Sequence, residues 1–217
     1  MTIFKRCGPY FLIAAALGDA SLPYLLGQFY PGYRQMTMLI SQLGETESPV
    51  ANWFNHGSLI TGTLFILGGI AMWRSFSHLP RLGCWLGGAI AFYGLGDCIL
   101  SSLVSISPQA SFFSPAYFFH AACSGLAMVA MMTVPLLLAG LAYLKNQLGW
   151  TYLYLSLFIG SLVTLILFAS YYLPGIGTWF ATTRGLWQRL SLLCLYLPTI
   201  LLAVTLLRFP QGLTSEA

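Results

Sequence analysis

The sequence predicts an all-α protein: a polytopic transmembrane bundle of six helices, with a short interfacial helix in the first outer loop. Composition is the first indication, since 58% of the 217 residues are apolar, 6% are charged and the mean hydropathy is +0.78. A soluble domain of this length does not need that balance. The second indication is six apolar stretches that reach the roughly 20 residues needed to cross a bilayer. They are residues 7–28, 51–73, 82–104, 117–143, 149–172 and 185–207.

The connections between these stretches are too short for a soluble domain, so residues 1–217 are predicted to form a single integral membrane domain. At the second and fourth spans, Ser48-Pro49 and Ser114-Pro115 each place a hydroxyl before a proline. This order is preferred at a helix N-terminus. Both pairs therefore predict helix starts.

The first span has a second interpretation as a cleaved signal peptide, because Lys5 and Arg6 precede its apolar run. That run continues past Asp19 to Leu26, which is longer than the roughly 7 to 15 residues of a signal-peptide core. We therefore interpret it as a membrane span.

The distribution of lysine and arginine predicts the orientation. Six basic residues fall on the side of the two termini and two on the opposite side, which places both termini in the cytoplasm and the protein in the cytoplasmic membrane. Because these residues are scattered over separate loops, the formal charge of +4 does not indicate a nucleic-acid partner. The lipid bilayer is the predicted partner. The six residues are Lys5, Arg6, Arg74, Arg81, Lys145 and Arg208, and the two are Arg34 and Arg184.

The first outer connection, residues 29–50, is long and amphipathic. Met36, Leu39, Ile40 and Leu43 recur at helical spacing, which predicts a short helix at the membrane surface. Two interpretations stay open: a connector packed on the membrane, or a lid over a site. The polar or flexible residues assigned to this loop are Arg34, Ser41 and Gly44.

Polar residues inside the spans converge on the outer side of the membrane. A charged group at the centre of a membrane helix costs roughly 2.5 to 3.5 kcal/mol on insertion scales, so such residues usually face a partner or a wet cavity. The sequence therefore predicts an outward-facing polar site that binds a small ligand, a lipid headgroup or a metal. Its candidate residues are Asp19, Asn55, His56, Asp97, His120, Arg184, Gln188 and Arg189.

Arg189 lies about four residues inside the sixth span, where its guanidinium cannot neutralise by losing a proton. We expect a carboxylate to hold it, with Asp97 preferred and Asp19 second. Gly94 and Gly96 would let the third span approach the sixth closely. Two cysteines in this region, at positions 98 and 123, leave a disulfide open.

Several short motifs resemble those of a membrane-protein family known as domain of unknown function 998. They are the Tyr30-Pro31-Gly32-Tyr33 run, the segment 38–44, Asn55, His120 and the run Gly185-Leu186-Trp187-Gln188-Arg189. The resemblance implies a six-helix membrane organisation and draws attention to Ser41, Gly44, His120, Gln188 and Arg189. It implies no substrate.

Three classes of function remain open. The first is a membrane-embedded binding or enzymatic site. His56, His120 and Asp97 could hold a zinc-like divalent metal, or Arg184 and Arg189 could bind an anionic lipid headgroup. No HExxH or GxSxG motif is present, so no reaction is assigned.

The second class is a proton- or cation-coupled transporter, in which Asp19, Asp97 and the histidines relay the ion. The charged residues stop short of the inner half of the membrane, which disfavours a complete path. The third class is a structural or partner-binding membrane protein that uses small residues such as Gly83 and Gly87 for helix contacts.

Overall fold

The protein is an integral membrane protein built of helices, and its computed structural model describes residues 3–111 and 113–209. Within that part there are six helices long and apolar enough to span a membrane, and no strand. The predicted spans are confirmed, with ends that differ by a few residues. Residues 210–217, which the sequence predicts to be cytoplasmic, lie outside the described residues. The spans are α1 (Ile3–Gly27), α2 (Ala51–Ser75), the third span, α5 (Pro115–Leu144), α6 (Leu148–Ser170) and α8 (Arg184–Arg208).

The third span is a composite helix. It runs as α3 (Pro80–Tyr93), then as the π-helical turn η2 (Gly94–Leu100), and ends in α4 (Ser101–Leu103). A π-helix inserts an extra residue into the turn, and such insertions are frequent at functional sites. Asp97 lies inside this turn.

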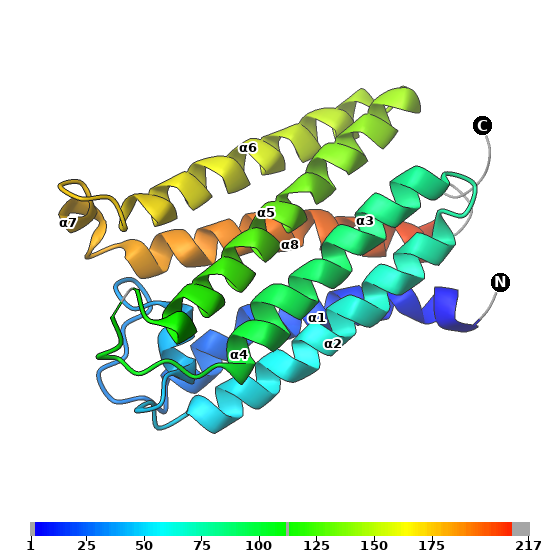
Figure 1. Cartoon of the computed structure of the whole chain (residues 1–217). Coiled ribbons are helices and arrows are strands. Elements are labelled where there is room, and N and C mark those ends of the chain that lie inside the picture. Colours follow the sequence, from blue (N-terminus) through cyan, green and yellow to red (C-terminus); the bar gives the residue numbers. More distant parts are fainter. Residues whose placement is uncertain (1–2, 112, 210–217) are drawn as a thin grey trace.

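Five of the spans form a closed ring, which consists of α1, α2, the third span, α5 and α8. Each packs against its two neighbours, and α8 closes the ring against α1 (Figure 1). Helix α6 lies outside the ring, against α5 and α8. Only 11% of its most apolar stretch is buried, compared with 50% for α5 and α8. The interior of the ring is therefore where buried polar groups of several helices meet.

The two ends of the bundle differ. The start of α1 and the end of α8 lie at one end, together with the short connections 76–79 and 145–147 (Figure 1). The opposite end, which we name the loop end, carries residues 28–50, 104–114 and 171–183. The last of these contains the short helix α7 (Gly177–Phe180). Exposed tryptophans mark both ends, as in an aromatic belt: Trp53 and Trp179 at the loop end, Trp73 and Trp85 at the other.

The two predicted helix starts have different outcomes. Ser114 is confirmed as the N-cap of α5, with its hydroxyl accepting a hydrogen bond from the backbone N–H of Tyr117 at 3.3 Å. The prediction for Ser48-Pro49 is wrong, because α2 begins two residues later, after Val50. The Ser48 hydroxyl accepts instead from the N–H of Val50 at 3.3 Å and so closes a turn before the helix.

The glycines of the third span allow close contacts, but not with the sixth span. A Cβ added at Gly94 would lie 2.5 Å from the carbonyl oxygen of Gly62 on α2. One added at Gly96 would lie 2.9 Å from the carbonyl of Cys123 on α5. The expected approach of the third span to α8 at these glycines is therefore wrong, since the ring places α2 and α5 beside them. Cys98 and Cys123 are free thiols.

The helix predicted in the first loop is present as the short 3₁₀ helix η1 (Ile40–Gly44). It is shorter than the apolar pattern indicates, because Met36 stays outside it and is 53% exposed. Leu39 and Leu43 are buried against the bundle. The Gln42 side chain closes the first turn by accepting from the Leu39 N–H at 2.9 Å. The loop is thus packed onto the helices at the loop end.

Candidate functional site

Arg189 is the centre of the contact between the first loop and α8. It is 8% exposed, and its guanidinium makes four hydrogen bonds. Nε donates to Gln35 Oε1 at 2.8 Å and Nη2 to the Tyr33 hydroxyl at 2.6 Å. Nη1 donates to the carbonyls of Met38 and Gly185, both at 2.9 Å. The guanidinium therefore fastens the loop to the start of α8.

The expectation that a carboxylate holds Arg189 is wrong. All four acceptors are neutral, and no carboxylate is among its partners in residues 3–111 and 113–209. The rings of Tyr24 and Tyr33 lie 5.9 and 5.7 Å from its Cζ atom, close enough for cation–π attraction. Loop carbonyls and side chains satisfy this arginine because the loop folds back over it.

Two further residues of α8 bind the same loop. Gln188 Oε1 accepts from the backbone N–H of Ile40 at 2.7 Å. Arg184 donates from Nε to the Thr37 carbonyl at 2.8 Å and from Nη1 to the Tyr171 hydroxyl at 2.6 Å. The Arg184 guanidinium also lies 4.7 Å from the centre of the Tyr171 ring.

Gly185 explains why the motif begins with glycine. A Cβ at this position would lie 2.6 Å from the Gln35 carbonyl and 2.9 Å from Arg189 Nη1. Next to it, the Leu186 N–H donates to the Met36 carbonyl at 3.0 Å. We name this group the docking motif. It consists of Arg184, Gly185, Gln188 and Arg189.

The far end of the loop is fixed to α2. Asn55 Nδ2 donates to the Gly44 carbonyl at 3.4 Å and to the Ser105 hydroxyl at 3.5 Å. A side chain on Gly44 would collide with the Asn55 amide. The N–H of Thr46 also donates to the Ile106 carbonyl at 3.1 Å, which joins the loop to residues 104–106. Both ends of η1 are thus held by bundle residues.

Glu45 follows η1 and is half-buried beside this contact. Burial raises the pKa of Glu45 to about 7, with Arg184 opposing the shift and Glu47 adding to it. Burial likewise raises the pKa of the Tyr33 hydroxyl, and Arg189 opposes that shift. The loop contact therefore contains a carboxyl that is protonated in mildly acidic solution.

A second polar group lies inside the ring, around Asp19. Its carboxyl accepts hydrogen bonds from the hydroxyl of Tyr196, from the Thr61 hydroxyl at 2.8 Å and from the Cys98 thiol at 3.8 Å. The Tyr196 hydroxyl in turn lies 2.6 Å from that of Tyr93, and both tyrosines are fully buried.

Asp97 belongs to the same group. Its carboxyl accepts from the Ser124 hydroxyl and is also a hydrogen-bonding partner of Tyr93. The Ser101 hydroxyl donates to its backbone carbonyl. Every helix of the ring contributes a member to what we name the aspartate network. Its members are Asp19 of α1, Thr61 of α2, Tyr93, Asp97 and Cys98 of the third span, Ser124 of α5 and Tyr196 of α8.

A cavity of about 120 Å³ lies between α1 and α8 and joins the two groups. Asp19 and Arg189 are its charged lining residues, and Ile40 of η1 contributes to its wall. Tyr24 and Leu193 also line it and are 50% and 47% exposed, so the cavity reaches the outer surface of the bundle. The remaining lining residues are Ala20, Leu186, Leu190, Leu192 and Tyr196.

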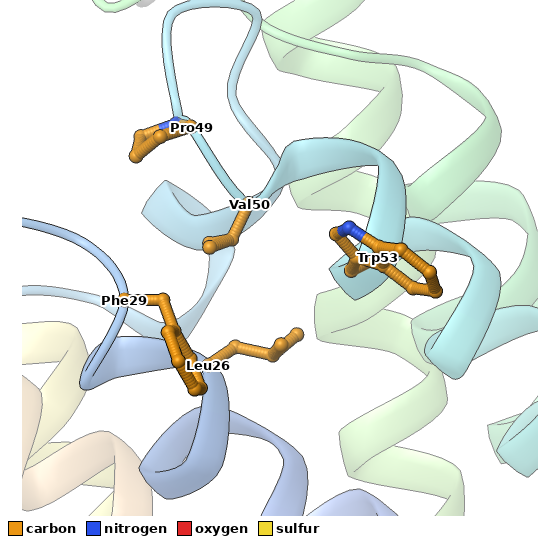
Figure 2. A pocket seen from close by; sticks show the side chains of 5 residues that line it. All are labelled: Leu26, Phe29, Pro49, Val50 and Trp53. Atoms are coloured by element: carbon orange, nitrogen blue, oxygen red, sulfur yellow. The ribbon is translucent and has the colours of Figure 1, made fainter.

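A larger groove of about 390 Å³ lies where α1 ends and α2 begins. Figure 2 shows Leu26 and Phe29 on one side of it, with Val50 and Trp53 on the other. Pro49 completes the lining, which contains no charged residue. The groove offers apolar contact but no group for catalysis or ion binding.

The histidines are not brought together as metal ligands. His56 is exposed, and its Nδ1 lies 2.7 Å from the Asn52 carbonyl of its own helix. His120 Nδ1 lies 3.1 Å from the Ser101 carbonyl. In the described part of the chain, no group of three His, Cys, Asp or Glu residues is arranged to hold a metal ion. The zinc-like site expected from His56, His120 and Asp97 has no geometric support.

The two other loop candidates have minor places. Arg34 is exposed, and its carbonyl accepts from the N–H groups of Thr37 and Met38 in a turn. Ser41 is half-buried in η1.

Sequence reasoning missed several residues of both groups. Tyr196 carried a usable signal, since it lies seven residues, or two helical turns, after Arg189 and so on the same helix face. Thr61 is the buried hydroxyl of its turn, whereas the nearby Thr63 is exposed and bonds to its own helix. Tyr33 and Gln35 lie in an irregular loop, where periodicity gives no signal.

The model of the family described as "Protein of unknown function (DUF998)" matches residues 13–205. The chain belongs to this family. The matched residues include the docking motif, the aspartate network and the cavity between them. DUF998 membership confirms the resemblance seen in the sequence motifs and brings no ligand or reaction with it. No curated protein and no solved structure matches the chain.

Proposed function

We propose that this DUF998 protein binds the polar head of a lipid or a similar amphipathic molecule in the cavity between α1 and α8. The observation that carries the proposal is the pairing of Asp19 and Arg189 in one cavity whose other walls are mostly apolar. A charged side chain inside a membrane usually faces a partner or a wet cavity. Tyr24 and Leu193 provide the side opening through which an amphiphile would enter from the bilayer.

The chemistry of the cavity defines the class of ligand. Asp19 offers carboxyl oxygens to a hydroxyl or ammonium group. Arg189 has five N–H groups, and four are engaged, so one remains for an acceptor such as a carbonyl or phosphoryl oxygen. The leucines that line the cavity would contact the aliphatic part. A head that carries both a donor and an acceptor fits best.

The proposal includes the placement of the protein. Residues 1–217 form one integral domain of the cytoplasmic membrane with both termini in the cytoplasm, as the six-to-two distribution of basic residues indicates. The loop end then faces outward, and the cavity lies in the outer half of the bilayer. Because Ile40 of η1 lines the cavity, the docked first loop acts as its lid.

The test measures lipids and other amphiphiles that stay bound during purification, by mass spectrometry of extracts. We expect the wild-type protein to retain one class of amphiphile in clear excess over its share of the membrane. Asp19→Asn should reduce the retained amount several-fold. Asp97→Asn is the matched control, because Asp97 does not line the cavity.

Ala20→Phe tests the same site without touching a polar group, since Ala20 lines the cavity and its replacement would fill it. Loss of the amphiphile in this variant, with a normal gel-filtration profile, supports the proposal. A wild-type extract with only the average composition of the membrane, unchanged in both variants, would overturn it.

A further inference from the structure

We infer that Asp19 and Asp97 hold one proton between them and exchange it through the hydroxyls of Tyr93 and Tyr196. The inference concerns the ring interior and deepens the proposed site at Asp19, on which only its last consequence rests. Three links connect the carboxyls: Asp97 with Tyr93, Tyr93 with Tyr196 at 2.6 Å, and Tyr196 with Asp19.

Proton counting selects the charge state of this chain. Each hydroxyl has one proton to donate, and an ionised carboxylate has none. With both carboxyls ionised, the two tyrosines supply two protons for three links, so one link is left unmade. With both protonated, four protons meet three links, and one proton has no place in the chain. Only the state with one protonated carboxyl fills every link.

The exchange leaves all groups chemically intact. A proton passes from the Asp97 carboxyl to the oxygen of Tyr93, whose own proton passes to the oxygen of Tyr196. The Tyr196 proton then passes to Asp19. Both tyrosines end neutral, the negative charge has moved from Asp19 to Asp97, and no other reactant is needed.

The surroundings contain few groups that compete for this proton. From α2 the Asp19 carboxyl meets only the Thr61 hydroxyl, and from the third span it meets the Cys98 thiol. From α8 it meets Tyr196 and shares the cavity with Arg189. From α5 Asp97 meets the Ser124 hydroxyl. His120, also on α5, contacts the network only through the Ser101 carbonyl.

The position of the proton is tied to the cavity, because Asp19 lines it and Asp97 does not. A ligand that donates to Asp19 favours the state in which Asp19 carries the charge and Asp97 carries the proton. A ligand that accepts from Asp19 favours the reverse. Binding at the cavity is thereby coupled to the charge of the π-helical turn.

Infrared titration of the carboxylic C=O stretch tests the inference in purified protein in lipid nanodiscs. The chain contains only five acidic side chains, so the background is small, and a D19N/D97N double variant supplies it. We expect the difference signal to pass through a plateau at half of its acid limit, because one carboxyl stays protonated between two separated steps.

Tyr93→Phe and Tyr196→Phe each remove one hydroxyl and keep the aromatic packing. Either variant should narrow the plateau by about one pH unit or more, since interacting groups titrate in separated steps. Tyr154→Phe is the matched control, because Tyr154 is also buried but lies on α6, outside the network. A single step for both carboxyls in the wild type, or unchanged titrations in both network variants, would overturn the inference. Retained amphiphiles are measured separately, so this result and the proposed ligand site stand or fall independently.

Discussion

Arg189 keeps a full positive charge near the membrane interface because the first loop supplies its acceptors. Its planar fork meets four oxygens in different directions, which a lysine ammonium on a flexible stem cannot reproduce. Its burial in the sixth span could be predicted from the sequence. Its partners could not, because Tyr33 and Gln35 come from a loop more than 150 residues away, and their placement depends on the tertiary fold.

We predict that Arg189→Ala releases the loop from α8. The change strands the acceptors on Gln35 and Tyr33, and a buried group without its partner costs about 1 to 3 kcal/mol. Hydrogen exchange in residues 35–42 should become at least about tenfold faster, the equivalent of about 1.4 kcal/mol. Arg34→Ala is the control, because Arg34 is exposed in the same loop. Equal exchange rates in both variants would contradict the assigned role.

Glu45 should make the docked loop sensitive to pH. Its pKa is raised from 4.5 to about 7, so the folded protein binds this proton more tightly than the unfolded chain. The contribution is therefore present below about pH 4.5 and is lost as the pH rises through 7. The thermal unfolding midpoint should fall over this window, and Glu45→Gln should flatten the fall. Glu47→Gln, at an exposed neighbour, should keep most of the slope. A Glu45→Gln variant with the wild-type profile would refute the assignment.

At the scale of elements, hydropathy alone was enough to place the spans, because each helix must be apolar over about 20 residues whatever its neighbours are. Which helix faces Gly94 and Gly96 was beyond the sequence, since one helix's periodicity does not name its partner. The ring sets those partners as α2 and α5. The extent of η1 was also overestimated, because docking and not amphipathicity determines where that loop turns.

The start of α8 offers a test of docking that removes no hydrogen-bonding group. Gly185→Ala places a Cβ 2.6 Å from the Gln35 carbonyl, so the loop backbone has to move away. We expect limited proteolysis within residues 28–50 to become several-fold faster. Gly88→Ala is the matched control, because a Cβ there meets nothing within 4 Å. Identical cleavage rates for the two variants would mean that the loop tolerates the added methyl and that the close approach is not required.

For the whole molecule, the fold class and six spans could be predicted, whereas the functional group of residues could be predicted only in part. Asp19, Asp97, Arg184, Gln188 and Arg189 all have polar partners at or near the loop end, but they divide into two groups that share one cavity. A sequence reports the depth of each polar residue along its helix. It does not report rotation around the ring, and rotation separates the exposed His56 from the half-buried Asp97.

The orientation of the whole bundle is open to direct measurement. Single cysteines at Ser77 and Asn146 should react only with reagents added on the cytoplasmic side, and cysteines at Glu45 and Gln109 only with reagents added outside. The reason is the excess of basic residues on the first side. Labelling of Glu45→Cys from the cytoplasm would reverse the bundle and turn the proposed cavity to the inner leaflet.

Closure of the ring by α8 also affects how the protein is made. Asp19 and Tyr196 are 177 residues apart, so at roughly 5 to 20 residues per second a ribosome needs about 10 to 35 s to supply the second after the first. During that interval the first helices are already in the bilayer, and the Asp19 carboxyl lacks its tyrosine donor. We expect a nascent chain that stops before α8 to keep this carboxyl unshielded and its long loop undocked. An unfinished copy is thereby distinguishable from a finished one by features that membrane proteases recognise, an unpaired charge and a loose segment.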